Sequence, residues 1–582
     1  MEQAIPNKDR SWDLEADIVV VGSGAAGLPA AIRAADDGAS VIVVETNYDV
    51  GGHAILSGGH MPLGGGTSAQ KKYGIEDSPE LVFRDLTDWS IVRPNGWPDY
   101  RYNDRELMRA FADHCALTFE FLLANGVVFM DKAPDNHGAH NTGNSAPREN
   151  HAFWTKGAGL ESPNAQPGTG VIRPLENSAR AKGVRFLLNY KMTNLIREPS
   201  TAQRSGRVIG IAVQHTPRIM PGASAPLKSF RPDGNIESAN PTMKLRATKA
   251  VIIATGGNTS NINFRRMFDP RITTAIQCAG EPYSYQDASG EFAAMSIGAS
   301  LWGLANQALE NGATIRTQRT LGSRFNYIAW KLESPLFPLV KAQGLNVKDW
   351  QDLILVNQVG KRFYDETKGD YPHGNVYNDI NPYTPNDYRN SQNVQFDPTK
   401  YNFFNAAVAM NEYSEPPDYS AGPIWAIFDA DAVKREGWQV TPPYVDTEGY
   451  FFSANTLAEL AAAIKNEYQA KPMRGTTLQA TVERYNSFVD LGKDIDFGKP
   501  APMYKIQTPP FYAAWGTPVV HDSRAGLRIN AKCQVMDMNG QVIGGLYCAG
   551  ESAGGFNQHG MGRCATQGYI AGMNAAAEKP QE

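Results

Sequence analysis

A glycine-rich turn directly after an apolar strand is the feature of this sequence that most constrains its fold. Residues 17–21 read DIVVV, a continuous β-branched run typical of a strand buried on both faces. The turn at 22–27, GSGAAG, is followed by an alanine-rich segment at 25–37 that we expect to be helical, and then by a second strand at 41–44. Strand, glycine turn, helix and strand make one unit of a parallel sheet. The sequence therefore predicts an α/β fold with a Rossmann-like nucleotide-binding domain.

The residues of the turn suit the binding of a dinucleotide. Gly22 permits the tight turn, Gly24 lets the backbone approach a pyrophosphate, and Gly27 allows the helix and the sheet to pack closely. The start of the helix supplies N–H groups and a positive dipole for the phosphates. Glu45 ends the second strand, where its carboxylate can accept hydrogen bonds from ribose hydroxyls. The predicted cofactor contacts here are Gly22, Ser23, Gly24, Ala25, Ala26, Gly27, Glu45 and Thr46.

Three further glycine-rich segments extend the prediction to FAD. Residues 51–59, GGHAILSGG, provide a second glycine-lined backbone shortly after the acidic residue. An apolar strand runs into the turn at 255–257, and a C-terminal strand ends at 549–551, AGE. A retained flavin requires such wrapping, whereas a nicotinamide cofactor that binds and leaves does not. The predicted FAD contacts in these segments are Gly52, His53, Ser57, Gly58, Gly59, Thr255, Gly256, Gly257, Gly550 and Glu551.

The length of 582 residues exceeds what one hydrophobic core usually supports, so we expect two domains. The nucleotide-binding signals lie near both ends of the chain. The part between them has a different composition and is rich in Tyr, Asn and Pro at 371–389. We therefore predict an FAD-binding domain made of residues 1–300 and 506–582. A capping domain that binds the substrate is predicted at 301–505.

Charge and composition exclude several classes of partner. A net charge of -5, spread along the chain, gives no reason to expect nucleic acid or an anionic membrane. No stretch approaches the roughly 20 apolar residues that a membrane span needs. The residues before the apolar run at 16–31 are mainly acidic, which argues against a secretory signal. The five cysteines show no CxxC or CxxCH spacing, so we expect no metal site, no attached haem and a cytoplasmic location.

The sequence resembles the superfamily of FAD-dependent fumarate reductases, succinate dehydrogenase flavoproteins and 3-ketosteroid dehydrogenases over most of its length. The matching pieces are GSGAAG, ETNYDVGGHAILSGG, VIIATGG, ASGEFAAMSIGASL, ILVNQVGKRFYDE and GLYCAGESAGG. The resemblance implies a Rossmann-like FAD domain and a mobile cap, with the substrate between cap and flavin. It also implies that the last helix aims its N-terminus at the pyrimidine edge of the flavin, where its dipole stabilises the anionic reduced form. The residues concerned are Arg563, Ala565 and Thr566.

The chain departs from the fumarate reductases in two places. These enzymes carry a proton-donating arginine just past a segment like 361–366, KRFYDE, where this chain continues with TKGDY at 367–371. Their His-Pro-Thr substrate clamp aligns with LENG at 309–312, unless the ungapped match has slipped by a few residues. A dicarboxylate needs cationic partners, and a glutamate at the clamp would repel it. Both departures argue against fumarate as the substrate.

The same resemblance suggests the catalytic residues. His521 lies at a turn where the family has a histidine that holds or protonates a substrate oxygen, although a loop histidine satisfied by the backbone is the alternative. Arg563 and His559 lie where the family places residues near the flavin ring. Tyr364 and Tyr371 fall in the region where ketosteroid dehydrogenases use tyrosines as acid and base. A packed aromatic surface is the alternative for the tyrosines.

The predicted activity is hydride transfer at a carbon–carbon single or double bond adjacent to a carbonyl or carboxylate. His53 stands one residue closer to the glycine pair at 58–59 than the flavin-linking histidine of succinate dehydrogenases does, so we expect non-covalent FAD. The expected partners are a small-molecule substrate and an electron donor or acceptor. Two alternatives stay open: FAD-dependent oxidation of an alcohol or phenol by O2 or a quinone, and an electron-transfer or binding subunit without turnover of its own.

Overall fold

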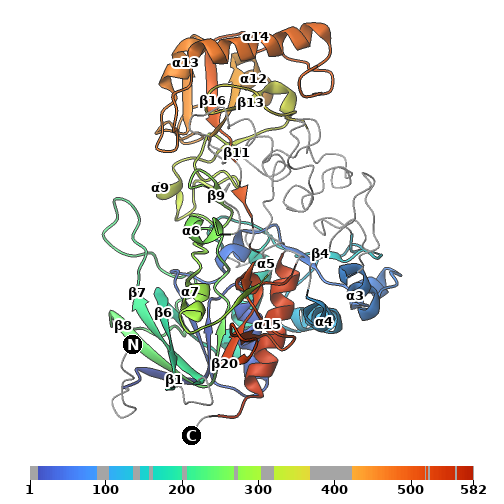
Figure 1. Ribbon diagram of the computed structural model, residues 1–582, viewed down its shortest axis with the longest axis vertical. Helices are drawn as coiled ribbons and strands as arrows, with labels where there is room; N and C mark the ends of the chain where they lie inside the picture. The colour runs from blue at the N-terminus through green and yellow to red at the C-terminus, as the bar shows by residue number, and fades with distance from the viewer. Residues whose placement is uncertain are drawn as a thin grey trace. The chain divides into compact units, whose positions relative to one another are not determined.

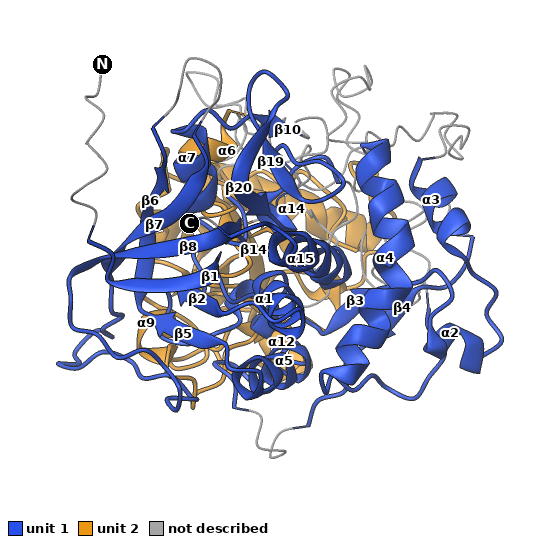
Figure 2. Cartoon of the chain, turned by 90° about the horizontal axis from the view of Figure 1, so that it is seen from below, with its two compact units in different colours: residues 1–258, 283–307, 522–582 blue, residues 259–282, 308–521 orange. Residues whose placement is uncertain are grey.

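A computed structural model provides the structure of the chain, which forms two compact units (Figure 2). It describes residues 11–87, 104–135, 145–155, 161–199, 206–267, 273–302, 320–367, 423–517, 519–521, 523, 525–556 and 560–580. Unit 1 comprises residues 1–258, 283–307 and 522–582, and unit 2 comprises residues 259–282 and 308–521. The predicted cap at 301–505 overlaps unit 2, which also includes 259–282 and extends to His521. The assignment of the units to flavin and cap stays a prediction.

Unit 1 is built on an eight-stranded sheet with a parallel centre. The path β19–β20–β8–β1–β2–β5 is extended by the antiparallel strands β7 and β6 beside β8. Figure 1 shows the C-terminal strand β20 beside β8, so both ends of the chain contribute to one sheet. The strands are β1 (Leu14–Val21), β2 (Val41–Glu45), β5 (Arg185–Leu188), β6 (Tyr190–Arg197), β7 (Val208–His215), β8 (Thr242–Ile253), β19 (Gln534–Met536) and β20 (Val542–Cys548).

The C-terminal ends of the central strands β1 and β8 are rich in β-branched residues, because both of their faces are covered. Ile18, Val19 and Val20 of β1 have no exposed surface, and β1 pairs in parallel with both β2 and β8. This arrangement confirms the predicted α/β class. The helices of unit 1 are α1 (Gly27–Asp36), α2 (Ser68–Lys72), α3 (Pro79–Thr87), α4 (Arg105–Ala124), α5 (Thr169–Ala181), α7 (Ser289–Met295), α15 (Met561–Ala576) and the 3-10 helices η1 (Gly52–Leu56) and η6 (Gly550–Ser552).

Two glycines let α15 lie directly against α1. A Cβ placed on Gly568 would be 2.2 Å from Ala26 O, and one placed on Gly572 would be 2.3 Å from Ala30 O. Any larger residue at either position would therefore push the helices apart. This contact fixes the start of α15 relative to the first glycine turn. Unit 1 also has short antiparallel pairs, β3 (His60–Pro62) with β4 (Glu149–His151) and β10 (Leu301–Trp302) with β18 (Gly526–Leu527).

Unit 2 contains a four-stranded antiparallel sheet in the order β13–β14–β16–β15. Alternate residues of its strands face two hydrophobic clusters: Leu355 and Phe428 belong to one, and Ile354 and Trp425 to the other. Its elements are β9 (Gln277–Cys278), β11 (Thr320–Leu321), β12 (Leu345–Asn346), β13 (Ile354–Asn357), β14 (Ile424–Asp429), β15 (Phe451–Ala454), β16 (Phe511–Trp515), β17 (Val519–Val520), α6 (Ile262–Arg265), α9 (Phe337–Val340), α12 (Ala430–Glu436), α13 (Leu457–Ala463), α14 (Gly475–Leu491) and the 3-10 helix η3 (Trp350–Asp352).

None of the helices in the described ranges is both long enough and apolar enough to cross a membrane. Within the same ranges, no group of three or more His, Cys, Asp or Glu residues is placed to hold a metal ion. All five cysteines are buried and unlinked.

Candidate functional site

In the first glycine turn, the fold itself requires glycine at two positions and has room for a side chain at a third. A Cβ on Gly22, whose φ is 103°, would lie 2.2 Å from Ala254 O. A Cβ on Gly27 would lie 1.9 Å from Gly22 O. Among the described residues, a Cβ on Gly24 would meet only Gly51 O, at 3.7 Å. The protein therefore leaves space beside Gly24, as a pyrophosphate that approaches the backbone requires.

The starts of α1 and α15 both suit a negatively charged group. Within the described ranges no side chain caps either helix, and neither first turn contains an acidic residue. The first N–H groups of a helix have no partner inside the helix and carry the positive end of its dipole. Phosphates can occupy the start of α1, and the flavin pyrimidine edge can occupy the start of α15.

Glu45 links the end of β2 to the first glycine turn. Its Oε2 accepts hydrogen bonds from Ser23 N at 3.0 Å and Ser23 Oγ at 2.6 Å, and its Oε1 accepts one from Asn47 N at 2.8 Å. Burial raises the pKa of the Glu45 carboxyl, and the bonds from Ser23 and Asn47 oppose that rise. A carboxylate oxygen accepts more than one hydrogen bond, so Oε1 has capacity for a ribose hydroxyl. Thr46, the next predicted contact, is exposed.

The turns that follow β8 and β20 are joined to one another by side chains. Gln286 Nε2 donates to Glu551 Oε2 and to Gly256 O, both at 2.9 Å. The hydroxyls of Thr255 and Ser552 lie 2.8 Å apart. Hydrogen bonds therefore hold the two predicted FAD segments together. The sequence reasoning missed Gln286 and Ser552, because a single polar residue without a motif carries no signal.

The second glycine segment leads from η1 to the start of α15. Gly52 and Gly59 have φ values of 50° and 73°, which favour glycine, and Ser57 Oγ lies 3.3 Å from Met561 Sδ. His53 lies within η1 and is half-buried. The residues of this segment fit a ligand that extends from the first turn to α15.

We expect FAD to be released when the purified holoenzyme is denatured. Precipitation with trichloroacetic acid should give a white pellet and a yellow supernatant, because the predicted contacts are hydrogen bonds and backbone cradles. Absorbance of the two fractions measures the result. A pellet that stays yellow after washing would show a covalent link, with His53 as the first residue to replace.

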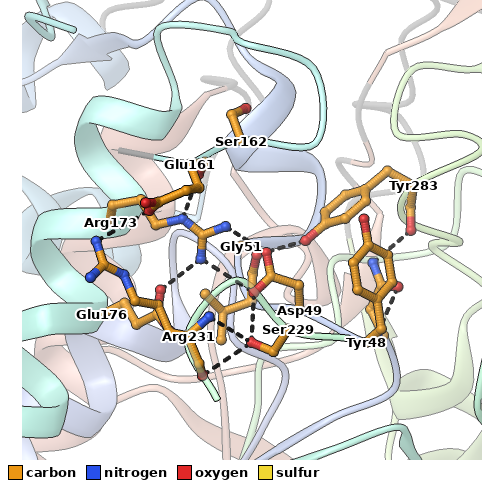
Figure 3. A network of polar contacts seen from close by, with 12 residues as sticks. Tyr48, Asp49, Gly51, Glu161, Ser162, Arg173, Glu176, Ser229, Arg231 and Tyr283 are labelled. Atoms are coloured by element: carbon orange, nitrogen blue, oxygen red, sulfur yellow. Dashed lines mark hydrogen bonds and ion pairs between the residues drawn. The ribbon is translucent and has the colours of Figure 1, made fainter. Parts of the chain in front are cut away.

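A network of buried charged side chains lies next to the start of the second glycine segment (Figure 3). Arg173 of α5 donates to the carboxylates of Asp49 and Glu176, and all three side chains are fully buried. Ser229 Oγ also donates to Asp49, at 3.0 Å. A Cβ on Gly51 would lie 2.9 Å from the Ile172 side chain in the same helix. The network thus joins α5 to the start of the segment.

Replacing Arg173 with methionine should lower the free energy of unfolding by about 3–5 kcal/mol, because it leaves two carboxylates buried without their cation. Urea denaturation of the FAD-free chain measures the change. The exposed ion pair of Lys182 and Asp36 is the matched comparison, since Lys182→Met should cost less than about 1 kcal/mol. Equal effects of the two substitutions would contradict the account of this network.

The Arg563 side chain donates hydrogen bonds to backbone carbonyl groups. Its guanidinium is fully buried and donates to Gly550 O at 3.0 Å, to Ala553 O, and to Ser523 O at 3.4 Å. It also lies over the Phe556 ring, 5.3 Å from the centroid. These contacts hold the turn after β20, and the predicted role of Arg563 as an anion or carbonyl ligand stays a prediction. Buried next to it in the first turns of α15 are Ala565 and Thr566.

His521 has a tyrosine partner in unit 2. The hydroxyl of Tyr327 lies 2.6 Å from His521 Nε2, and His521 directly follows β17, which pairs in parallel with β9. Tyr327 is buried, whereas His521 is half-buried. A hydroxyl that donates to Nε2 places the proton of the neutral ring on Nδ1. Tyr327 was missed in the sequence, where it lies in no motif.

The other candidate acids and bases are placed differently. Tyr364 is buried in the hydrophobic cluster of unit 2 that contains Leu355 and Phe428, so its observed surroundings are those of a packed aromatic residue. Its role as an acid or base stays a prediction. Tyr371, His559 and the segments that depart from the fumarate reductases, 309–312 and 368–371, lie outside the described residues.

Comparison with known proteins gives consistent matches over nearly the whole chain. A family model described as an FAD binding domain matches residues 17–565. Urocanate reductase of Eggerthella lenta is 26% identical, with 99% of this chain and 77% of the relative aligned. Fumarate reductase (cytochrome) of Shewanella frigidimarina is 27% identical, over 96% of this chain and 77% of the relative. The structure of 3-ketosteroid delta1-dehydrogenase from Sterolibacterium denitrificans matches with a TM-score of 0.61 and 20% identity, covering 97% and 99% of the two chains.

Proposed function

The chain belongs to the FAD-binding-domain family, and from this premise we propose that it reduces an α,β-unsaturated monocarboxylate or enone. Its general activity follows from the family and the relatives. FAD is its cofactor, and the chain is an oxidoreductase that transfers hydride at a carbon–carbon bond next to a carbonyl or carboxylate. The resemblance predicted from the motifs is thereby confirmed. The proposal adds the direction of the reaction and the class of substrate.

The hydrogen-bonded pair of Tyr327 and His521 is the observation that carries the proposal. An imidazole that accepts from a hydroxyl at Nε2 carries its proton on Nδ1 and can donate it to a carbonyl or carboxylate oxygen of a substrate. That donation draws electrons toward the oxygen and makes the β-carbon a better hydride acceptor. One imidazole can hold one oxygen of either a carboxylate or an enone, and the choice against a dicarboxylate rests on the sequence segments described next.

The sequence segments at 309–312 and 367–371 support the same choice. They contain Glu310 and Asp370, and their single cation is Lys368, with no arginine to form a two-point contact with a second carboxylate. Urocanate reductase and fumarate reductase are both among the relatives, which supports reduction as the direction.

FAD, when bound, supplies the hydride, and the chain's own residues hold it and the substrate. We propose that the glycine turns bind the pyrophosphate, that Glu45 binds the ribose, and that the first turn of α15 faces the pyrimidine edge. His521 then holds the substrate oxygen, and Tyr327 positions His521. We further propose non-covalent FAD and an electron donor that is a separate molecule.

Turnover with a reduced viologen as electron donor tests the substrate class. An enoic monocarboxylate or an enone should yield its saturated product, and fumarate should react far more slowly. Reduction of fumarate as fast as the best monocarboxylate would overturn the proposed class. Steady release of hydrogen peroxide with a phenol or alcohol, and no reduction of any enoate or enone, would favour the oxidase alternative instead.

A cytoplasmic location is also proposed, on the ground that all five cysteines are buried and unlinked. Fractionation of cells that express the natural gene, followed by immunoblotting, tests it. Detection of the chain mainly in an extracytoplasmic fraction would overturn this proposal.

A further inference from the structure

Four ionisable side chains gather on one side of the β3–β4 pair in unit 1, outside the site described above. His60 lies directly opposite His151 in this antiparallel pair, and Glu149 is two residues before His151 on the same strand face. Asp135 joins them through backbone bonds, since Glu149 N donates to Asp135 O at 2.8 Å. The four residues are called the β3–β4 cluster below.

The side chains of the β3–β4 cluster follow one another in a row. Asp135 Oδ2 lies 2.9 Å from His151 Nε2, and the His151 and His60 rings have centroids 4.6 Å apart. His60 Nδ1 lies 3.7 Å from Glu149 Oε1. The side chains of Asp135, His151 and His60 are 39%, 12% and 31% exposed, and the row ends at Glu149, which is 1% exposed. It therefore connects solvent to the interior of unit 1.

A glutamate is unusual at position 149, because its side chain is almost completely buried. Neither of its carboxyl oxygens has a hydrogen-bond partner within the described part of the chain. Burial raises the pKa of Glu149 well above its usual value, the negative charge of Asp135 adds to the rise, and Lys132 opposes it. A buried carboxyl without hydrogen bonds is costly unless it is protonated. Burial therefore favours the protonated form of Glu149, whose Oε1 lies 3.7 Å from His60 Nδ1.

The β3–β4 cluster also borders the proposed flavin site. A Cβ on Gly58 would lie 3.2 Å from His60 Cδ2 and Nε2, and Ala152 N donates to Gly59 O at 2.9 Å. A Cβ on Gly562, in the first turn of α15, would lie 2.7 Å from Pro62 O. The second glycine segment, predicted to contact FAD, and the first turn of α15, proposed to face the pyrimidine edge, thus both touch the strands that carry the cluster.

We propose that Asp135, His151, His60 and Glu149 form a proton relay between solvent and the flavin. Reduction of FAD to its anionic reduced form consumes two electrons and one proton, and two molecules of a one-electron donor supply the electrons. His60 gives up the proton and regains one from His151, which takes it from solvent at Asp135. The Glu149 carboxyl is a second group that can give a proton to His60. The inference rests on the proposed location of the flavin, and it does not depend on the substrate.

Stopped-flow bleaching of the holoenzyme by a reduced viologen, in H2O and in D2O, tests the relay. His60→Ala should slow bleaching by about a hundredfold, the low end of what a positioned proton donor contributes. Added imidazole should restore much of the rate. Asp135→Asn, a change at an exposed side chain, should slow bleaching severalfold and enlarge the effect of D2O. In the FAD-free chain, the His60 ring signals in a nitrogen-15 NMR spectrum should shift in Glu149→Gln.

The matched control is His215→Ala, since the His215 ring packs at a tilt against Tyr190 with centroids 4.9 Å apart, in the β6–β7 pair. It should bleach at the wild-type rate. Wild-type rates and isotope effects in both His60→Ala and Asp135→Asn would overturn the relay. A slow His60→Ala that imidazole does not rescue, with Asp135→Asn unchanged, would also overturn it and show a structural role for His60. No organic substrate is present, so a failure of the relay is distinguishable from a failure of the proposed substrate class.

Discussion

Replacing Gly24 with alanine should weaken FAD binding by a hundredfold or more, about 3 kcal/mol, and leave the fold intact. The new Cβ would meet only Gly51 O, at 3.7 Å, among the described residues, so the chain itself has room for it. The pyrophosphate does not have that room, because it must approach the backbone at this glycine. Displacing it loses charge-assisted hydrogen bonds worth about 1.5–3 kcal/mol each. Titration of the FAD-free chain with FAD, followed by flavin fluorescence, measures the loss.

Gly544→Ala is the matched control for this substitution. Its Cβ would have its nearest contact at the same distance, 3.7 Å from Arg207 Cγ, but Gly544 lies in β20 away from the proposed phosphate site. We expect this variant to bind FAD like the wild type. Gly27→Ala, whose Cβ would lie 1.9 Å from Gly22 O, should instead destabilise the fold itself. An unchanged FAD affinity in Gly24→Ala would contradict the proposed place of the pyrophosphate.

The second large effect is expected at His521. His521→Ala should lower kcat/KM by about a hundredfold or more, as the loss of a positioned proton-handling group does. FAD content should be unchanged, because His521 is not among the proposed FAD contacts. Tyr327→Phe keeps the imidazole but removes its 2.6 Å partner, so a smaller loss of about tenfold is expected. Steady-state kinetics with the best enoate or enone measures both.

A tyrosine of the same unit provides the control for Tyr327. The Tyr512 ring stacks on Phe428 in the sheet of unit 2, with centroids 5.3 Å apart. Tyr512→Phe should leave kcat/KM within about twofold of wild type, because its ring contact is kept. A His521→Ala variant with full activity would remove the pair from the mechanism, and a Tyr327→Phe variant equal to Tyr512→Phe would remove only the positioning role.

Much of unit 1 could be predicted because its signals are local. The strand expected at 17–21 is the second half of β1, the helix expected at 25–37 is α1 (Gly27–Asp36), and the strand expected at 41–44 is β2. In each case a β-branched run, a glycine or a run of alanines decides the backbone of its own segment. The positions Gly22 and Gly27 could be assigned for the same reason, since the turn requires glycine there.

The parts of the fold and of the site that could not be predicted depend on contacts between residues far apart in the chain. Segment 259–282 belongs to unit 2 and contributes β9, whose two residues pair with the two residues of β17. Strands that short have no periodicity from which pairing could be predicted. The same holds for Tyr327, which is 194 residues from His521, and for Gln286, which is 265 residues from Glu551. Single polar residues acquire such roles only through the fold.

Anaerobic mixing of the reduced holoenzyme with one candidate substrate at a time tests the central claim most directly. The claim is hydride transfer to a carbon–carbon double bond next to a carbonyl or carboxylate. An enoic monocarboxylate or an enone should restore the visible absorbance of oxidised flavin, with one saturated product formed for each flavin reoxidised. A flavin that stays bleached with every such compound, while O2 alone restores its absorbance, would contradict the account.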